Sequence, residues 1–212
     1  MAAEPAGRVV AGMVTKAYML TLVLIRPGTT DYDIQERIQG NLDIPLSDAG
    51  SREVAELAAK LKPQELSVIY APETQPAEQT ARLLSKALEV RLRNLDGIDN
   101  IDLGLWQGMT VAEVRRKQPK VYRQWQEQPE TVCPPNGEPL FQAEERLRPA
   151  IAKLLRRHPE GAVGVVVAEP MRNLVRRLLT HAPLGDLWRA TQEHEAVEVL
   201  TVDPETVFQA IN

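Results

Sequence analysis

The sequence predicts an α/β protein, a three-layer α/β/α sandwich with a mostly parallel central sheet. Two observations support this fold class. Short β-branched and leucine-rich runs alternate with longer segments whose apolar residues recur at helical spacing. The two most hydrophobic runs, residues 19–25 and 161–167, show no regular polar alternation, which is typical of strands buried on both faces of a parallel sheet.

The first strand is expected to lead into a loop and then a capped helix. Its apolar run stops at Pro27. Residues 31–45 are polar and have no long period, so they predict a loop with one helical turn over the sheet edge. Ser47 can serve as the N-cap of a helix whose apolar positions recur at helical spacing until Pro63 ends it.

A second strand, a helix and a third strand should follow. Residues 66–71 are a short apolar run of the buried kind. Thr74 can cap the next helix, since Pro76 is tolerated in a first helical turn. Residues 90–95 then predict a third strand.

The middle of the chain predicts further helices. Thr110 and Glu113 form a capping-box pattern that opens a short helix, and Pro119 separates it from the next helical piece. A long helix is expected over residues 140–157. Pro149 should kink or break it, because proline removes a backbone hydrogen-bond donor.

The last quarter begins with the most hydrophobic run after the first strand. Residues 161–167 predict a central parallel strand, and residues 171–179 the helix after it. Residues 195–202 and 206–211, separated by Asp203 and a proline, predict two final strands, as a hairpin or at a sheet edge.

Composition limits the class of protein. With 212 residues, 43% hydrophobic and 25% charged, the chain suits one domain with a sizeable core, which we expect over residues 17–212. A net charge of −4 and no long apolar run indicate neither a nucleic-acid nor a membrane partner. The single cysteine, Cys133, excludes an intrachain disulfide and a multi-cysteine metal site, so a cytoplasmic location is expected.

Residues 1–16 are interpreted as a flexible N-terminal tail. Their apolar stretch is short and interrupted by Gly7 and Gly12. A signal peptide is the alternative interpretation, but it requires a charged region before a continuous apolar region, and this segment lacks that order.

Five segments resemble, in order, the motifs of one family. They are Leu24–Asp31, Arg37–Gly50, Gln79–Ala81, Ile101–Gly108 and Pro134–Glu138. The first is similar to a strand followed by Arg-His-Gly-Glu-Thr. The chain therefore resembles the histidine phosphatase superfamily, with its phosphoglycerate mutase-like fold. The resemblance implies phosphomonoesterases or phosphoglycerate mutases that need no metal or other cofactor and pass a phosphoryl group through a histidine.

Four positions that carry the chemistry of this family hold other residues here. The resemblance places the nucleophilic histidine at Pro27, an arginine of the phosphate clamp at Pro76, the acid at Asn100 and a second histidine at Glu169. A proline nitrogen in a peptide bond has no free lone pair, and asparagine cannot act as an acid. A carboxylate at roughly 4 Å opposes a phosphate by about 4 kcal/mol at an effective dielectric near 20. We therefore expect no catalytic residue at these degenerate positions.

Candidate ligand contacts remain at the expected pocket. They are Arg26, Thr30, Arg37, Asn41 and Glu169. Arg26 could hold an anion or pair with Glu169. The pair is favoured, because a buried carboxylate without a partner is costly.

Other residues could in principle replace the missing groups. Arg172 could supply a cation, but a solvated helix residue is the favoured interpretation. None of His158, His181 and His194 directly follows a central strand, so ordinary surface or partly buried histidines are favoured over a relocated nucleophile.

The favoured hypothesis is a pseudophosphatase: a catalytically inactive member of the family that acts by binding, as a regulatory or structural partner or a ligand binder. A homo-oligomer is one form that such a role could take. The alternative is an active phosphomonoesterase or mutase-like enzyme with an altered pocket. A third hypothesis is a binder of an uncharged or cationic molecule, because Glu169 inverts part of the pocket charge.

Overall fold

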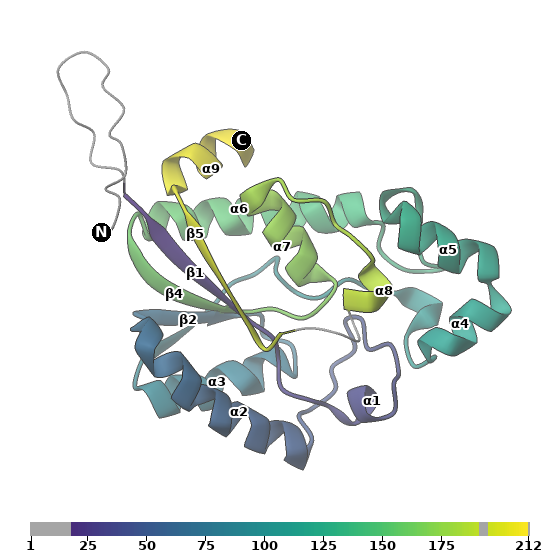
Figure 1. The fold of residues 1–212 in the computed structure, drawn as a ribbon, viewed down its shortest axis with the longest axis horizontal. Coiled ribbons are helices and arrows are strands. Elements are labelled where there is room, and N and C mark those ends of the chain that lie inside the picture. The colour runs from purple at the N-terminus through teal and green to yellow at the C-terminus, as the bar shows by residue number, and fades with distance from the viewer. Residues whose placement is uncertain (1–17, 191–194, 212) are drawn as a thin grey trace, which may run out of the picture.

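A single mixed sheet forms the centre of the molecule (Figure 1). The computed structural model describes residues 18–190 and 195–211, so the predicted tail at residues 1–16 and His194 lie outside the described residues. The sheet has five strands in the order β3-β2-β4-β1-β5. They are β1 (Leu20–Ile25), β2 (Val68–Ala71), β3 (Arg91–Asn94), β4 (Gly161–Val166) and β5 (Val197–Val202). The pairs β1–β4, β2–β4 and β2–β3 are parallel, and β5 is antiparallel to β1, which confirms the predicted fold class.

Helices connect the strands and cover both faces of the sheet. They are α1 (Asp31–Ile34), α2 (Asp48–Leu61), α3 (Ala77–Leu88), α4 (Val111–Lys117), α5 (Pro119–Glu127), α6 (Leu140–Arg157), α7 (Met171–Thr180), α8 (Leu187–Ala190) and α9 (Pro204–Ile211). Three short 3-10 turns are η1 (Lys62–Gln64), η2 (Gly104–Trp106) and η3 (Pro129–Thr131). None of the described helices combines the length and apolar character that a bilayer crossing requires.

The side chains of β1 alternate between two cores. Leu20, Leu22 and Leu24 belong to the core that α6 and α7 cover. Val23 and Ile25 belong to the core that α2 and α3 cover. Figure 1 shows these two pairs of helices on opposite faces of the sheet. Each fully buried aliphatic side chain contributes roughly 1.5–3 kcal/mol, so β1 is held from both faces and its end point is well defined.

The carboxyl ends of β1 and β4 lie side by side. Ile25 pairs with Val166 in parallel register, and Val167 donates its backbone N–H to the Ile25 carbonyl at 2.9 Å. The chain therefore leaves both strands at one edge of the sheet, where loops of α/β proteins form ligand sites.

A tryptophan cluster anchors the segment between β3 and β4. Trp106, Trp125 and Trp188 are buried, and the ring centroids of Trp106 lie 5.3 Å from those of both other tryptophans. This cluster fixes η2, α5 and α8 to one another. Figure 1 shows α1, α4 and α5 beyond the end of β1.

Several predicted helix starts are confirmed. Ser47 accepts a hydrogen bond from the backbone of Gly50 as the N-cap of α2. Thr110 and Glu113 form both hydrogen bonds of a capping box at the start of α4. One helical turn, α1, lies in the predicted loop after the first strand.

The predicted final strand at residues 206–211 is wrong, because the segment is helix α9. Asp203 explains the difference. Its carboxylate accepts from the backbone N–H groups of Glu205 and Thr206 at 3.0 and 3.4 Å. Pro204 occupies the first helical position, where its missing N–H has no effect. These contacts nucleate a helix in a segment whose Thr, Val, Phe and Ile residues by themselves favour a strand.

The predicted N-cap of α3 and the predicted break in the long helix are also wrong. Pro76, and not Thr74, is the N-cap of α3; the Thr74 hydroxyl donates instead to Asp99 at 3.4 Å. Helix α6 continues through Pro149 without a break. Pro149 is exposed while Leu147 and Ala150 beside it are buried, so packing on the inner face holds the helix together.

Candidate ligand pocket at the ends of β1 and β4

A cavity of about 410 Å³ opens at the carboxyl ends of β1 and β4. All four positions that the sequence singled out as degenerate, Pro27, Pro76, Asn100 and Glu169, line this cavity. Residues far apart in the sequence thus meet at one sheet edge, as the parallel topology requires.

Close packing of two backbones fixes the loop after β1. A Cβ atom on Gly28 would lie 2.7 Å from Cγ2 of Val54 and 2.9 Å from the carbonyl oxygen of Gly50. Only glycine therefore fits at this approach to α2. The backbone N–H of Gly28 donates to the Thr80 hydroxyl at 2.9 Å, which ties the loop to α3.

Thr30 does not line the cavity. It is fully buried, and its hydroxyl caps α1 by accepting from the backbone N–H of Asp33 at 3.2 Å. The carboxylate of Asp33 accepts in turn from the backbone N–H of Thr30 at 2.7 Å, which completes a capping box. The sequence marked this threonine as a candidate ligand contact, whereas its position in the structure gives it a local role in holding α1.

Arg26 pairs with Asp33, and not with Glu169. The Nη2 atom of Arg26 lies 3.4 Å from Oδ1 of Asp33. The predicted Arg26–Glu169 pair is therefore wrong. The capping box of α1 holds the Asp33 carboxylate next to the arginine. This contact could not be predicted from the positions of the strand ends alone.

Glu169 has its own partners on α7. Its Oε2 accepts from the side-chain amide of Asn173 at 2.7 Å, and its Oε1 lies 3.7 Å from Nε of Arg172. Arg172 is only 5% exposed, so the interpretation of it as a solvated residue is wrong. Its guanidinium also lies 3.3 Å from the carboxylate of Glu198 and donates to the Glu195 carbonyl at 2.7 Å. The spacing of three residues between Glu169 and Arg172, at the start of a helix, is the sequence signal for this pair.

Burial raises the pKa of Glu169 to about 7 from its ordinary value near 4.5. The cations of Arg172 and Arg176 oppose this rise but do not cancel it. Because a buried carboxylate is poorly solvated, its charged form is only partly satisfied by the arginines around it. Glu169 therefore keeps its proton to a higher pH than an ordinary carboxylic acid does.

Asn100 bridges three backbone segments. Its side-chain NH₂ donates to the carbonyl oxygens of Gly40 and Glu169 at 2.9 and 2.8 Å. Its Oδ1 accepts from the backbone N–H of Met171 at 3.3 Å, at the first turn of α7. The asparagine thus has a structural role that the sequence did not indicate.

A model of the histidine phosphatase superfamily (branch 1) matches residues 22–211. The chain belongs to the histidine phosphatase superfamily. The resemblance inferred from the five sequence segments is thereby confirmed at the level of the family.

Several relatives and solved structures are similar to this superfamily member. Phosphoserine phosphatase 1 of Hydrogenobacter thermophilus is 33% identical over 186 residues, covering 87% of this chain and 88% of that protein. Glucosyl-3-phosphoglycerate phosphatase of Mycobacterium tuberculosis is 32% identical over 139 residues, covering 66% and 62%. The structure of mycobacterial hydrolase 1 superposes with a TM-score of 0.75 at 25% identity, covering 86% and 92% of the two chains. A phosphoglycerate mutase from Bacillus anthracis shares the fold, with a TM-score of 0.72 at 20% identity over 87% and 88%.

The other candidate contacts of this superfamily member lie at or beside the cavity. Arg37 lines it but is exposed, and its guanidinium donates to Gln35 at 3.0 Å and to the Gly108 carbonyl. Asn41 lines a narrow neighbouring recess, where its backbone N–H donates to Gln107 at 2.9 Å. Ligand binding by Arg26, Arg37, Asn41 and Glu169 stays a prediction.

The two histidines within the described residues lie away from the cavity. His158 ends α6, and its Nε2 lies 2.9 Å from the Tyr70 hydroxyl. Burial lowers the pKa of His158. His181 is the C-cap of α7 in a left-handed conformation. Among residues 18–190 and 195–211, no group of three or more His, Cys, Asp or Glu side chains is arranged to hold a metal ion.

Proposed function

We propose that this member of the histidine phosphatase superfamily is a pseudophosphatase, which binds a ligand in the cavity and transfers no phosphoryl group. The observation that carries the proposal is Pro27. It lines the cavity at the point where the family motif has its nucleophilic histidine. A nucleophile needs an available lone pair, and the nitrogen of a proline within the chain contributes its lone pair to the peptide bond.

The phosphate clamp is weak for two reasons that support the same proposal. Pro76 contributes no charge where the family motif has an arginine. Arg26, which is retained, lies next to the Asp33 carboxylate at 3.4 Å, so an entering phosphate would have to compete with that carboxylate. Phosphate binding in the cavity should therefore be poor.

The residue at the position of the family's acid also supports the proposal that no phosphoryl group is transferred. Asn100 has no ionisable proton, and both its amide donors are already held by carbonyl oxygens. A carboxylate in this place would face those two oxygens and repel them. The surroundings of residue 100 are thus suited to an amide and would oppose a restored acid.

The second candidate function is a working phosphatase with an altered pocket. Two of the similar relatives favour it, because they cover 87% and 66% of this chain and are named as phosphatases. Such an enzyme would need a nucleophile other than residue 27, either a different side chain or an activated water molecule.

Hydrolysis of p-nitrophenyl phosphate and of phosphoserine by the full chain separates these two functions. The Arg26→Ala variant is the matched control, because a pocket activity would depend on the remaining clamp arginine. The proposal predicts that the native chain and the variant release phosphate at the same rate as buffer. Release by the native chain that Arg26→Ala abolishes would establish the phosphatase instead.

A further inference from the structure

Several backbone donors near the cavity are directed into the protein, whereas two side-chain acceptors there are not fully used. The hydrogen-bonding groups of the cavity indicate which class of ligand it binds, and this inference rests on the proposed binding function. A phosphate-binding site normally presents free backbone N–H groups and unpaired cations.

Four backbone donors in or near the wall of the cavity are used within the protein. Gly28 donates to Thr80 at 2.9 Å, and Thr29 donates to Glu53 at 3.2 Å. The N–H groups of Thr30 and Met171 are held by the side chains of Asp33 and Asn100 at 2.7 and 3.3 Å. An anion would have to displace these side-chain oxygens to reach any of the four donors.

The acceptors are less completely used. Oε1 of Glu169 has an ion-pair partner at 3.7 Å, which is beyond hydrogen-bond distance. Oε1 of Gln75 is buried and has no hydrogen-bond partner within the described part of the chain. Gln75 lies in the recess that shares Pro76, Asn100 and Ala168 with the cavity. A buried acceptor of this kind favours a ligand that brings its own donor.

The charged residues of the cavity also favour a ligand that brings donors. Among the described residues that line it, the carboxylates are Asp33, Glu36 and Glu169 and the guanidinium groups are Arg26 and Arg37. Arg172, the partner of Glu169, divides its guanidinium among two carboxylates and a carbonyl oxygen. Burial leaves the charged form of the Glu169 carboxylate poorly solvated, so a cation beside it would be stabilising.

We infer that the cavity takes a small cationic ligand whose ammonium or guanidinium group donates hydrogen bonds to Glu169. The apolar part of such a ligand can lie against Ile38, Leu103 and Val111, which line the same space. A volume of about 410 Å³ is within the ordinary range for a small-molecule site. Phosphate esters are disfavoured, because their phosphate group brings only acceptors and negative charge to this wall.

Calorimetric titration of the full chain at about pH 8 tests the inference with three probes of similar size. Agmatine is cationic, hexane-1,6-diol is neutral and glycerol 1-phosphate is anionic. We expect saturable heat from agmatine, weaker binding of the diol and none of the phosphate. Glu169→Gln should weaken agmatine binding about tenfold, because it removes a charge-assisted hydrogen bond. Glu169→Asp keeps a carboxylate and should retain most of the affinity.

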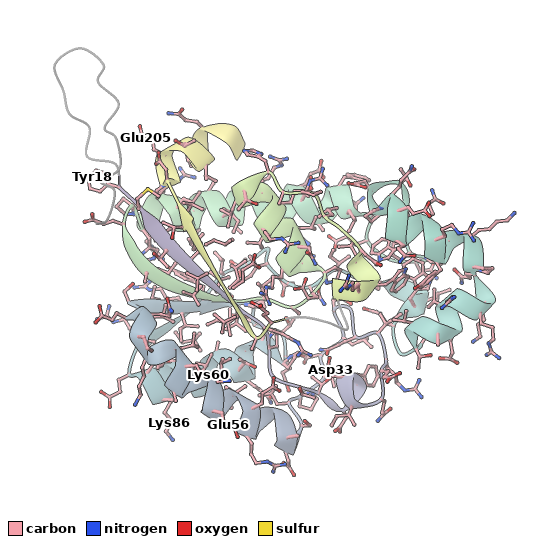
Figure 2. The ribbon with its side chains drawn as sticks, viewed as in Figure 1. Tyr18, Asp33, Glu56, Lys60, Lys86 and Glu205 are labelled. Atoms are coloured by element: carbon pink, nitrogen blue, oxygen red, sulfur yellow. The ribbon has the colours of Figure 1, made fainter. Side chains whose placement is uncertain are left out.

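Glu56→Gln is the matched control, since it removes one carboxylate from the exposed outer face of α2, away from the cavity (Figure 2). The inference is overturned if no probe binds, if glycerol 1-phosphate binds best, or if Glu169→Gln and Glu56→Gln weaken agmatine binding equally. Phosphate released from glycerol 1-phosphate is measured in the same samples. Turnover would overturn the proposed binding function, whereas a preference for the phosphate without turnover would overturn only the ligand class.

Discussion

Glu169 should make the free energy of unfolding fall as the pH rises. Its pKa in the folded protein is about 7, above the value near 4.5 expected for the unfolded chain. Between these two pKa values the native state binds more protons than the unfolded state. The stabilising contribution of the Glu169 proton is therefore complete below about pH 4.5 and is lost as the pH rises to about 7. At 1.36 kcal/mol for each pKa unit, this one group should account for a loss of about 3 kcal/mol.

Urea unfolding from about pH 4.5 to 8.5, followed by the fluorescence of the buried tryptophans, measures this loss. Glu169→Gln is neutral throughout, so it should match the native chain near the acid end and exceed its stability by about 3 kcal/mol near pH 8. Glu56 is exposed, so the stability of Glu56→Gln should follow the pH dependence of the native chain. If the native chain and Glu169→Gln show the same pH dependence, the buried and poorly solvated state of this carboxylate is refuted.

Three further substitutions test the surroundings of the cavity. Asn100→Ala should lower the free energy of unfolding by about 2 kcal/mol in urea melts, because it leaves buried carbonyl groups unpaired; a neutral effect would remove the bridging role. Arg172→Met should cost about 3–5 kcal/mol near pH 8, since it leaves Glu169 and Glu198 without their shared cation, and less near pH 5; an equal cost at both pH values would argue against the ion pairs. Pro27→His should not create p-nitrophenyl phosphate hydrolysis, because the clamp and the acid are also absent and these groups act as a unit; activity in this single variant would show that they are not needed.

Local sequence patterns predicted most of the fold. The apolar runs of β1 and β4 and the proline after β1 located the sheet edge where the cavity opens. The helix starts at Ser47 and Thr110 were predicted correctly, because the hydrogen bonds of these capping residues reach only three residues along the chain. The same logic explains the failure at residues 206–211, where the capping carboxylate of Asp203 starts a helix although Thr, Val, Phe and Ile favour a strand.

The partners inside the pocket could not be predicted in the same way. The choice of Arg26 between Asp33 and Glu169 depends on where α1 lies relative to the sheet, which no local pattern contains. The bridge made by Asn100 joins residues 60 and more positions away. Arg172 was misjudged because an arginine near a helix start is usually solvated, whereas here β5 covers it through Glu198.

If this protein is the pseudophosphatase that we propose, no phosphoryl group passes through it. Intact mass spectrometry of the native chain, quenched during incubation with phosphoserine, tests it most directly. A pseudophosphatase should show only the unmodified mass at every time point. A transient phosphate adduct that forms and decays while orthophosphate accumulates would contradict it.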